Sequence, residues 1–364
     1  MTRFREFGVG AFGGTNYFQF HDRTIISRLK EIGGLTFYKD YSDLGLNANY
    51  SVGSLTGTLT SARDATHPAT YIDKNGVIQT TTTADVGRFD YGYYDATGYH
   101  AFTLPKLHIE GARTNEVIQG IHASAWTLED SFAGTPTTAL VAETLTSIAA
   151  SKAQTFVYTA SVGESGGYGS LYSDFTAVGS VAQDDVVTIS GYIRGTVTGT
   201  AAIKLTMKVY DDVGGGGETL EGSNMASSIH ATEWRRFSAT LTITDADASK
   251  IRMKFPTFAG VDEGDAFSLE VACCQLEVSS YATSFIPTVA AGLGRTAEVL
   301  KYVISGNRTA ATEGCVVNLI PEYASTISAA NNYIIDSDTK ARAVYLNAAS
   351  NDVYVYPNIT DTVG

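Results

Sequence analysis

The sequence has 364 residues, enough for two or three domains with sizeable cores. It is 44% hydrophobic and only 17% charged, with 36 glycines, 21 tyrosines and 16 phenylalanines, which is typical of strands joined by turns. A formal net charge of −13 disfavours binding to nucleic acid or anionic membranes, and no stretch reaches the ~18 apolar residues of a membrane span.

Residues 1–53 predict an N-terminal attachment arm with little core of its own. Asp22 can cap one short helix, whose apolar residues recur at i, i+4 and i+7 up to Gly33. Such a helix is marginal alone, so we expect it to dock on the same chain or on neighbouring copies. Residues 8–13 match GxGxxG, but no βαβ unit follows, so no nucleotide cofactor is predicted. The first residues also lack the apolar region of a signal peptide.

Residues 54–118 predict a β connector. Turn signals at Lys74-Asn75-Gly76 and Ala96-Thr97-Gly98 separate short β-prone runs. The aromatic segment 89–94 favours packing or an interface over a sugar platform.

Residues 119–290 carry the clearest alternation of apolar and polar side chains. Ile203, Leu205, Met207 and Val209 fall on one face of a strand, with polar or tyrosine side chains between them. The pattern recurs in at least six runs, at 154–162, 187–194, 203–210, 236–244, 250–255 and 266–277. These runs predict an antiparallel β-sandwich of the jelly-roll type, in a mostly β protein.

Residues 290–296 predict a linker, and residues 291–364 the start of a second, incomplete sandwich. Its short strands are expected at 314–320, 333–336, 341–347 and 352–356.

Two groups of motifs resemble phage tail-fibre and minor virion proteins. Residues 107–115 read LHIEGARTN, which resembles the LxIEGARTN signature of these proteins, and segments 68–73, 76–80 and 88–91 resemble the stretches that precede it. Residues 274–277 (CQLE) and 282–288 (ATSFIPT) resemble the end of their jelly-roll modules, although Val278 stands where glycine is usual. Residues 295–300 (RTAEVL) resemble the segment that leads into a laminin-G or concanavalin-like sandwich.

The resemblance implies a bacteriophage virion structural protein, a tail or neck fibre or spike subunit. It implies a module like carbohydrate-binding modules, a homotrimer, and contacts with other virion proteins of the tail, neck or capsid and with host-surface glycans. Such a protein is assembled in the host cytoplasm and needs no membrane insertion. The resemblance implies no catalytic residue, so we expect no enzyme activity.

Candidate binding residues are few. Trp126 and Trp234 are candidates for glycan contact by stacking, although packing in the core or at an edge is the more frequent role. Acidic loops at 211–212, 245–247 and 262–265 are candidates for a structural Ca²⁺ site, which related jelly rolls often hold.

The remaining reactive residues predict no site. The six histidines, at 21, 67, 100, 108, 122 and 230, show no metal-ligand spacing. Cys273 and Cys274 are adjacent on a predicted strand and should point to opposite faces, so with Cys315 they predict buried thiols and no disulfide framework.

Two other functions stay open. A glycan depolymerase or glycosidase needs only two well-placed carboxylates, which a single sequence with 38 acidic residues does not reveal. A purely architectural head or neck decoration protein would use the same sandwiches as spacers.

Overall fold

The computed structural model describes residues 69–81, 88–108, 110–117, 120, 126–148, 152–177, 179–289 and 292–297, and the backbone of seven further strands. Its contacts divide the chain into two units. One comprises residues 41–45 and 59–301, and the other 1–40, 46–58 and 302–364. The expected helix after Asp22, the GxGxxG segment, Cys315 and the expected strand 314–320 lie outside the described residues.

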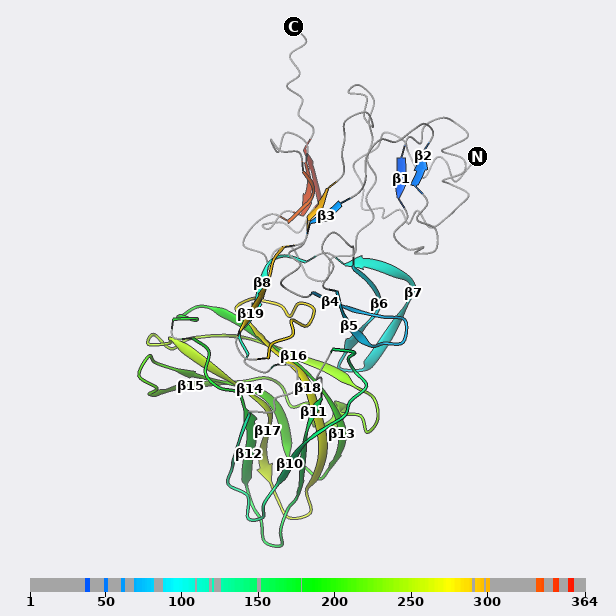
Figure 1. Ribbon diagram of the computed structural model, residues 1–364. Helices are drawn as coiled ribbons and strands as arrows, with labels where there is room; N and C mark the ends of the chain where they lie inside the picture. Colours follow the sequence, from blue (N-terminus) through cyan, green and yellow to red (C-terminus); the bar gives the residue numbers. More distant parts are fainter. Residues whose placement is uncertain are drawn as a thin grey trace. The chain divides into compact units, whose positions relative to one another are not determined.

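Two five-stranded antiparallel sheets face each other in the larger unit (Figure 1). The first, here the β18 sheet, has the order β10 (Thr137–Val141), β11 (Ala153–Thr159), β18 (Ala266–Glu277), β13 (Val186–Thr198), β16 (Arg235–Thr242). The second, here the β17 sheet, has the order β15 (Gly216–Glu221), β14 (Ala202–Tyr210), β17 (Lys250–Val261), β12 (Gly167–Tyr172), β9 (Thr127–Asp130). The chain crosses between the sheets repeatedly, so the predicted antiparallel β-sandwich is confirmed.

Alternation of side chains explains why these segments form facing layers. On β14, Ile203, Leu205, Met207 and Val209 are buried in the core, and the side chains between them point outward. Aromatic rings fill the centre, where Phe156 of one sheet stacks on Phe258 of the other at 4.3 Å between ring centroids. Among the described residues the only helix is a short 3₁₀ turn, Ala226–Ser228. The described part therefore has no helix that is long and apolar enough to cross a membrane.

Residues of the predicted connector form two hairpins in the same unit. Strand β4 (Ala69–Ile72) pairs with β5 (Ile78–Thr81), and β6 (Arg88–Asp95) pairs with β7 (Gly98–His108). Both predicted turns are present, each with a glycine at positive φ, +78° at Gly76 and +124° at Gly98. Ile78 and Phe285 join a second small core on the outer side of the β18 sheet.

The chain leaves the sandwich beside the point at which it enters. Strand β8 (Arg113–Asn115) pairs with β19 (Leu293–Arg295), and β3 (Thr60–Ala62) pairs with β20 (Val299–Lys301). The prediction of a plain linker at 290–296 is therefore wrong, because backbone hydrogen bonds to the signature segment hold residues 293–295 in a strand.

The described strands of the smaller unit form two paired groups. Strand β1 (Phe37–Lys39) pairs with β2 (Asn49–Ser51). Strands β21 (Asn332–Asp336), β22 (Ala343–Leu346) and β23 (Val353–Tyr356) form an antiparallel meander. Three of the strands expected after residue 291 are thus present, and their assembly into a second sandwich stays a prediction.

Candidate functional site

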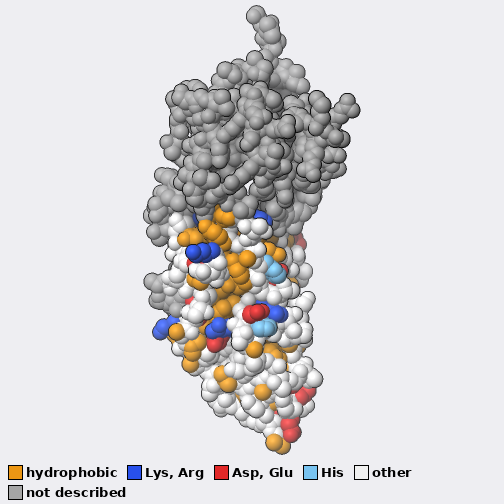
Figure 2. Space-filling view, turned by 90° about the vertical axis from the view of Figure 1, so that its right-hand side faces the viewer, with side chains coloured by type: hydrophobic (Ala, Val, Ile, Leu, Met, Phe, Trp, Pro, Cys, Tyr) orange, Lys and Arg blue, Asp and Glu red, His pale blue; other side chains and the backbone are white. Residues whose placement is uncertain are grey.

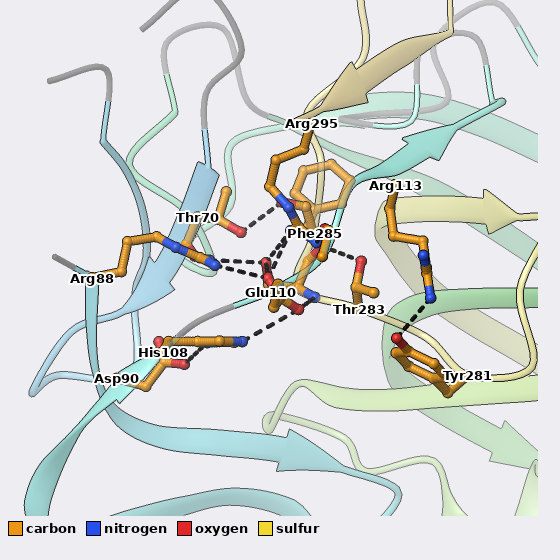
Figure 3. A network of polar contacts seen from close by, with 12 residues as sticks. Thr70, Arg88, Asp90, His108, Glu110, Arg113, Tyr281, Thr283, Phe285 and Arg295 are labelled. Atoms are coloured by element: carbon orange, nitrogen blue, oxygen red, sulfur yellow. Dashed lines mark hydrogen bonds and ion pairs between the residues drawn. The ribbon is translucent and has the colours of Figure 1, made fainter. Parts of the chain in front are cut away.

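The signature residues meet at a buried cluster of charged side chains (Figure 3). We call it the Glu110 cluster, and its members are Arg88, Asp90, His108, Glu110, Ser284 and Arg295. The Glu110 carboxylate lies 2.9 Å from the Arg88 guanidinium and 2.7 Å from that of Arg295. It also accepts a hydrogen bond from the backbone N–H of Ser284 at 2.7 Å. The side chains of Arg88 and Arg295 have no exposed surface.

His108 closes the cluster on the side of hairpin β6–β7. Its Nδ1 contacts the Asp90 carboxylate, and its Nε2 lies 3.2 Å from Glu110 Oε1. Burial alone would lower the pKa of His108, but the two carboxylates outweigh it and raise that pKa to about 10. Burial likewise opposes ionisation of Glu110, yet His108, Arg295 and Arg88 hold its pKa well below the usual range. Both groups are therefore charged at neutral pH.

A second set of buried polar contacts joins the remaining motif residues. Asn115 donates to the carbonyl oxygens of Cys274 and Ile286, and accepts from Leu276 N–H at 3.1 Å. Glu277 accepts two hydrogen bonds from Thr283, at 2.6 and 2.9 Å. Burial raises the pKa of Glu277, although these hydrogen bonds act in the opposite direction.

These contacts explain why the two motif groups occur together. The signature at 107–115 and the exit segment at 282–288 hold each other through hydrogen bonds to buried backbone, and Arg113 donates to the Tyr281 hydroxyl at 2.7 Å. Every charged group of the Glu110 cluster has an opposite charge beside it. We assign the cluster to holding the entry and exit of the sandwich, because its charges already neutralise one another within the chain.

The cationic face is a different kind of surface, on the outer side of the β17 sheet. Strand register and alternation place nine residues there or at its edge, namely Tyr168, Tyr172, Phe175, Lys204, Lys208, Tyr210, Lys250, Arg252 and Lys254. All except Lys254 are half-buried, so the rings and charges are open to solvent in part. Lys254 donates to Glu129 at 2.9 Å and to the Tyr168 hydroxyl at 3.1 Å.

Aromatic rings and cations alternate across this face. The Arg252 guanidinium lies 4.1 Å from the Tyr172 ring centroid and 3.9 Å from that of Phe175, and Lys250 Nζ lies 4.9 Å from the Phe175 ring. Rings supported on a sheet offer flat apolar surfaces, and long cationic side chains beside them offer hydrogen-bond donors. Such an arrangement suits a polyhydroxylated ligand.

A groove of about 490 Å³ lies over the outer side of β16. Its lining includes Tyr94, Asp95, Ser238, Thr240, Ser280 and Tyr281. It combines aromatic walls with exposed hydroxyls, and Asp95 is its single carboxylate.

Hairpin β6–β7 lies at the right of Figure 1, and Figure 2 views the molecule from that side. Hydrophobic side chains gather there in a band, with basic, acidic and histidine side chains among them. Tyr93 is 46% exposed and its ring stacks on His100 at 4.8 Å, while Lys106 Nζ lies 3.7 Å from the Phe102 ring. The hairpin surface is therefore apolar with mixed charge.

The tryptophans proposed for glycan contact lie elsewhere. Trp126 is 9% exposed within the main core, and Trp234 is 5% exposed in the smaller core, under the Arg194 guanidinium at 4.7 Å. Neither ring offers an open face for stacking, so the structure places both in packing roles. Neither tryptophan belongs to the cationic face.

The carboxylates of the acidic loops accept hydrogen bonds from backbone N–H groups. Asp265 accepts from Thr200 and Asp262, Asp262 accepts from Gly166, and Asp211 accepts from Gly215. Across the described ranges, no three His, Cys, Asp or Glu side chains gather in a way that could hold a metal ion. A structural Ca²⁺ stays a prediction.

The histidines and cysteines within the described part have ordinary roles. His100, His108 and His230 each lie beside a carboxylate. Cys273 and Cys274 are free and buried, one in each hydrophobic core, so the prediction of opposite faces is confirmed.

Comparison with solved structures gives alignments of low sequence identity and low TM-score. No family model and no curated protein matches the sequence. A carbohydrate-binding module from the β-sandwich superfamily aligns with 60% of this chain and 98% of its own length at 12% identity and a TM-score of 0.33. A family 11 carbohydrate-binding module from Clostridium thermocellum, in complex with a mixed-linked tetrasaccharide, aligns with 50% of this chain and 99% of its own at 13% identity and a TM-score of 0.31.

One further neighbour is viral. The enzymatically active domain of tailspike protein 4 from bacteriophage CBA120 aligns with 44% of this chain at 11% identity and a TM-score of 0.33. The aligned part spans 21% of that tailspike chain.

Proposed function

We propose that this protein is a non-enzymatic structural protein of a phage virion, a tail or neck fibre or spike subunit, that presents a glycan-binding β-sandwich to the host surface. The observation that carries the glycan-binding part is the cationic face. On it Tyr168 and Tyr172 of β12 and Tyr210 of β14 flank the central strand β17, half-exposed and interleaved with lysine and arginine. The virion setting rests on the motif resemblance, whose residues form the buried contacts at the entry and exit of the sandwich.

The proposal includes assembly as a homotrimer attached to other virion proteins. Single contacts between a sheet face and a sugar are weak. Three copies on a spike, and many spikes on a particle, raise the effective concentration of the second contact and give avid attachment.

The arrangement of carboxylates supports a binding role over glycan hydrolysis. Hydrolysis uses two carboxyl groups that flank the scissile bond. The groove over β16 has one carboxylate, Asp95, which already accepts from Thr97 and His100. Two carboxylates with little exposed side chain, Glu110 and Glu277, are occupied by ion pairs and hydrogen bonds.

Two measurements test the proposal. Purified particles of the phage that encodes the protein should contain it as a trimer, and a stable monomer absent from particles contradicts the virion role. On a glycan array the full chain should bind, and Tyr172→Ala should reduce binding. Ser238→Arg, which obstructs the groove over β16, serves as the matched control and should bind normally. Release of reducing ends from a bound polysaccharide would instead establish the depolymerase.

A further inference from the structure

Arg252 is a charged side chain without an acidic partner. Its guanidinium is held between the rings of Tyr172 and Phe175, with Tyr210 at 5.8 Å. The ion pairs and hydrogen bonds of the described chain include none made by this side chain, and its Nε is buried without a hydrogen-bond partner. A guanidinium that is oriented by rings and lacks a carboxylate is prepared to bind an anion.

The neighbours of Arg252 add positive charge to an acidic protein. Lys204 and Lys254 are paired with Glu221 and Glu129. Lys208 and Lys250 donate only to backbone carbonyl oxygens, those of Gly217 and Asp212. Arg252, Lys208 and Lys250 therefore form a cationic stripe that makes no ion pair among the described residues, on a chain whose formal net charge is −13. Such a local excess attracts anions that the rest of the surface repels.

Hydroxyl groups without partners lie on the same side of the sheet. Ser170 faces Thr257 in register, and Thr206 faces Lys254. All three hydroxyl side chains are at most 1% exposed, and their oxygens have no hydrogen-bond partner among the described residues. Buried hydroxyls normally have a partner, so three such oxygens beneath the cationic face mark this part of the sheet as unusual.

We propose that the cationic face binds an acidic polysaccharide, with Arg252 holding a carboxylate or phosphate group of the glycan while Tyr172 and Tyr210 pack against its sugar rings. This inference rests on the proposed glycan binding and adds that the glycan is negatively charged. The glycan supplies negative charge for the stripe and ring faces for the tyrosines, and a neutral glycan would leave the guanidinium desolvated and unpaired.

Affinity electrophoresis of the full chain tests the inference. The gels contain sodium polygalacturonate, which carries carboxylates, a glycerol-phosphate teichoic acid, which carries phosphates, or neutral dextran. At least one acidic polymer should retard the protein more than dextran does, and added salt should weaken the retardation. The acidic polymer that binds identifies the source of the charge.

Variants show whether Arg252 is responsible for binding the acidic polymer. Arg252→Gln should reduce affinity for the acidic polymer about tenfold. Arg252→Lys should restore part of the affinity, because the charge remains but the planar group is lost. Arg194→Gln is the matched control, since Arg194 also lies over an aromatic ring but is paired with Glu270 on the other sheet. It should leave affinity unchanged.

The outcomes separate the two proposals. Binding of dextran or of neutral array glycans that Tyr172→Ala reduces and Arg252→Gln does not would overturn the acidic ligand and leave glycan binding standing. Equal retardation by double-stranded DNA would also overturn it, because the face would then respond to any polyanion. No binding to any of these polymers or to the glycan array would overturn both.

Discussion

Glu110 and Arg295 form an ion pair of 2.7 Å that joins the segment before the sandwich to the segment after it. The two residues are 185 positions apart in the sequence, and the side chain of Arg295 is fully buried. Because Arg88 of hairpin β6–β7 contacts the same carboxylate, three parts of the larger unit depend on one buried anion. The stability of the unit should therefore be sensitive to Glu110.

Glu110→Ala should destabilise the larger unit by about 3–5 kcal/mol, because it leaves two buried guanidinium groups without a counter-charge. Urea unfolding followed by tryptophan fluorescence measures the change, since Trp126 and Trp234 are both buried in this unit. Glu270→Gln is the control. It breaks the partly exposed pair with Arg194 and should cost about 0–1 kcal/mol. Equal losses in the two variants would show that the Glu110 cluster does not hold the segments together.

The same cluster predicts how stability depends on pH. The pKa of His108 is raised to about 10 in the folded protein, against about 6.5 in an unfolded chain. Its contribution is complete below pH 6.5 and is lost as pH rises towards 10. The pKa of Glu110 is depressed, so its contribution is present above its unfolded value and is lost as pH falls through the folded one. These two groups favour a stability maximum between about pH 5 and 6.5.

The variant His108→Gln tests the loss of stability that is expected as pH rises above 6.5. It should be clearly less stable than the natural sequence at pH 6, and the difference should narrow by pH 10, where the natural protein also loses the imidazolium charge. Thermal unfolding at a series of pH values measures both. A difference that stays constant from pH 6 to 10 would show that His108 is not charged in the folded state.

The strands that the sequence predicts are those with a strict period of two. The runs 187–194, 203–210 and 236–244 each became a strand of the sandwich, because burying their apolar face requires a partner sheet. Strands β9, β10, β12 and β15 were not predicted. Gly167 and Gly169 interrupt β12, and every residue of β10 except Val141 is exposed, so neither carries a countable alternation.

The same alternation could in principle have predicted part of the cationic face. Lys250, Arg252 and Lys254 alternate with the buried Ile251 and Met253, which already assigns three cations to one side of a strand. What the sequence does not provide is the neighbouring strand. The pairing of Arg252 with Lys208, and the approach of Tyr172 and Phe175, depend on strand order and register. For the same reason, the sequence placed Glu110, Arg88 and Arg295 in three motif segments but did not predict that they are ion-pair partners.

Burial should keep both described cysteines unreactive. Cys273 and Cys274 are at most 1% exposed, and burial raises the pKa of both thiols, so almost no thiolate is present at neutral pH. In a Cys315→Ser background, a disulfide-exchange reagent such as DTNB should label no thiol in the native protein and two in urea. Labelling of the native protein faster than it unfolds would contradict the buried placement.

Gly195 tests the packing of β13 against β18. Its φ is +138°, and an added Cβ would lie 2.1 Å from the carbonyl oxygen of Ser268. Gly163 also has a positive φ, +78°, but an added Cβ there would meet nothing within 4 Å. Gly163→Ala should therefore cost only the strain of a left-handed alanine, about 1–2 kcal/mol. Gly195→Ala adds a steric clash with backbone that the sheet cannot move without breaking hydrogen bonds, so its loss in urea unfolding should be clearly larger. Similar losses at both glycines would mean that β13 and β18 approach less closely than their register requires.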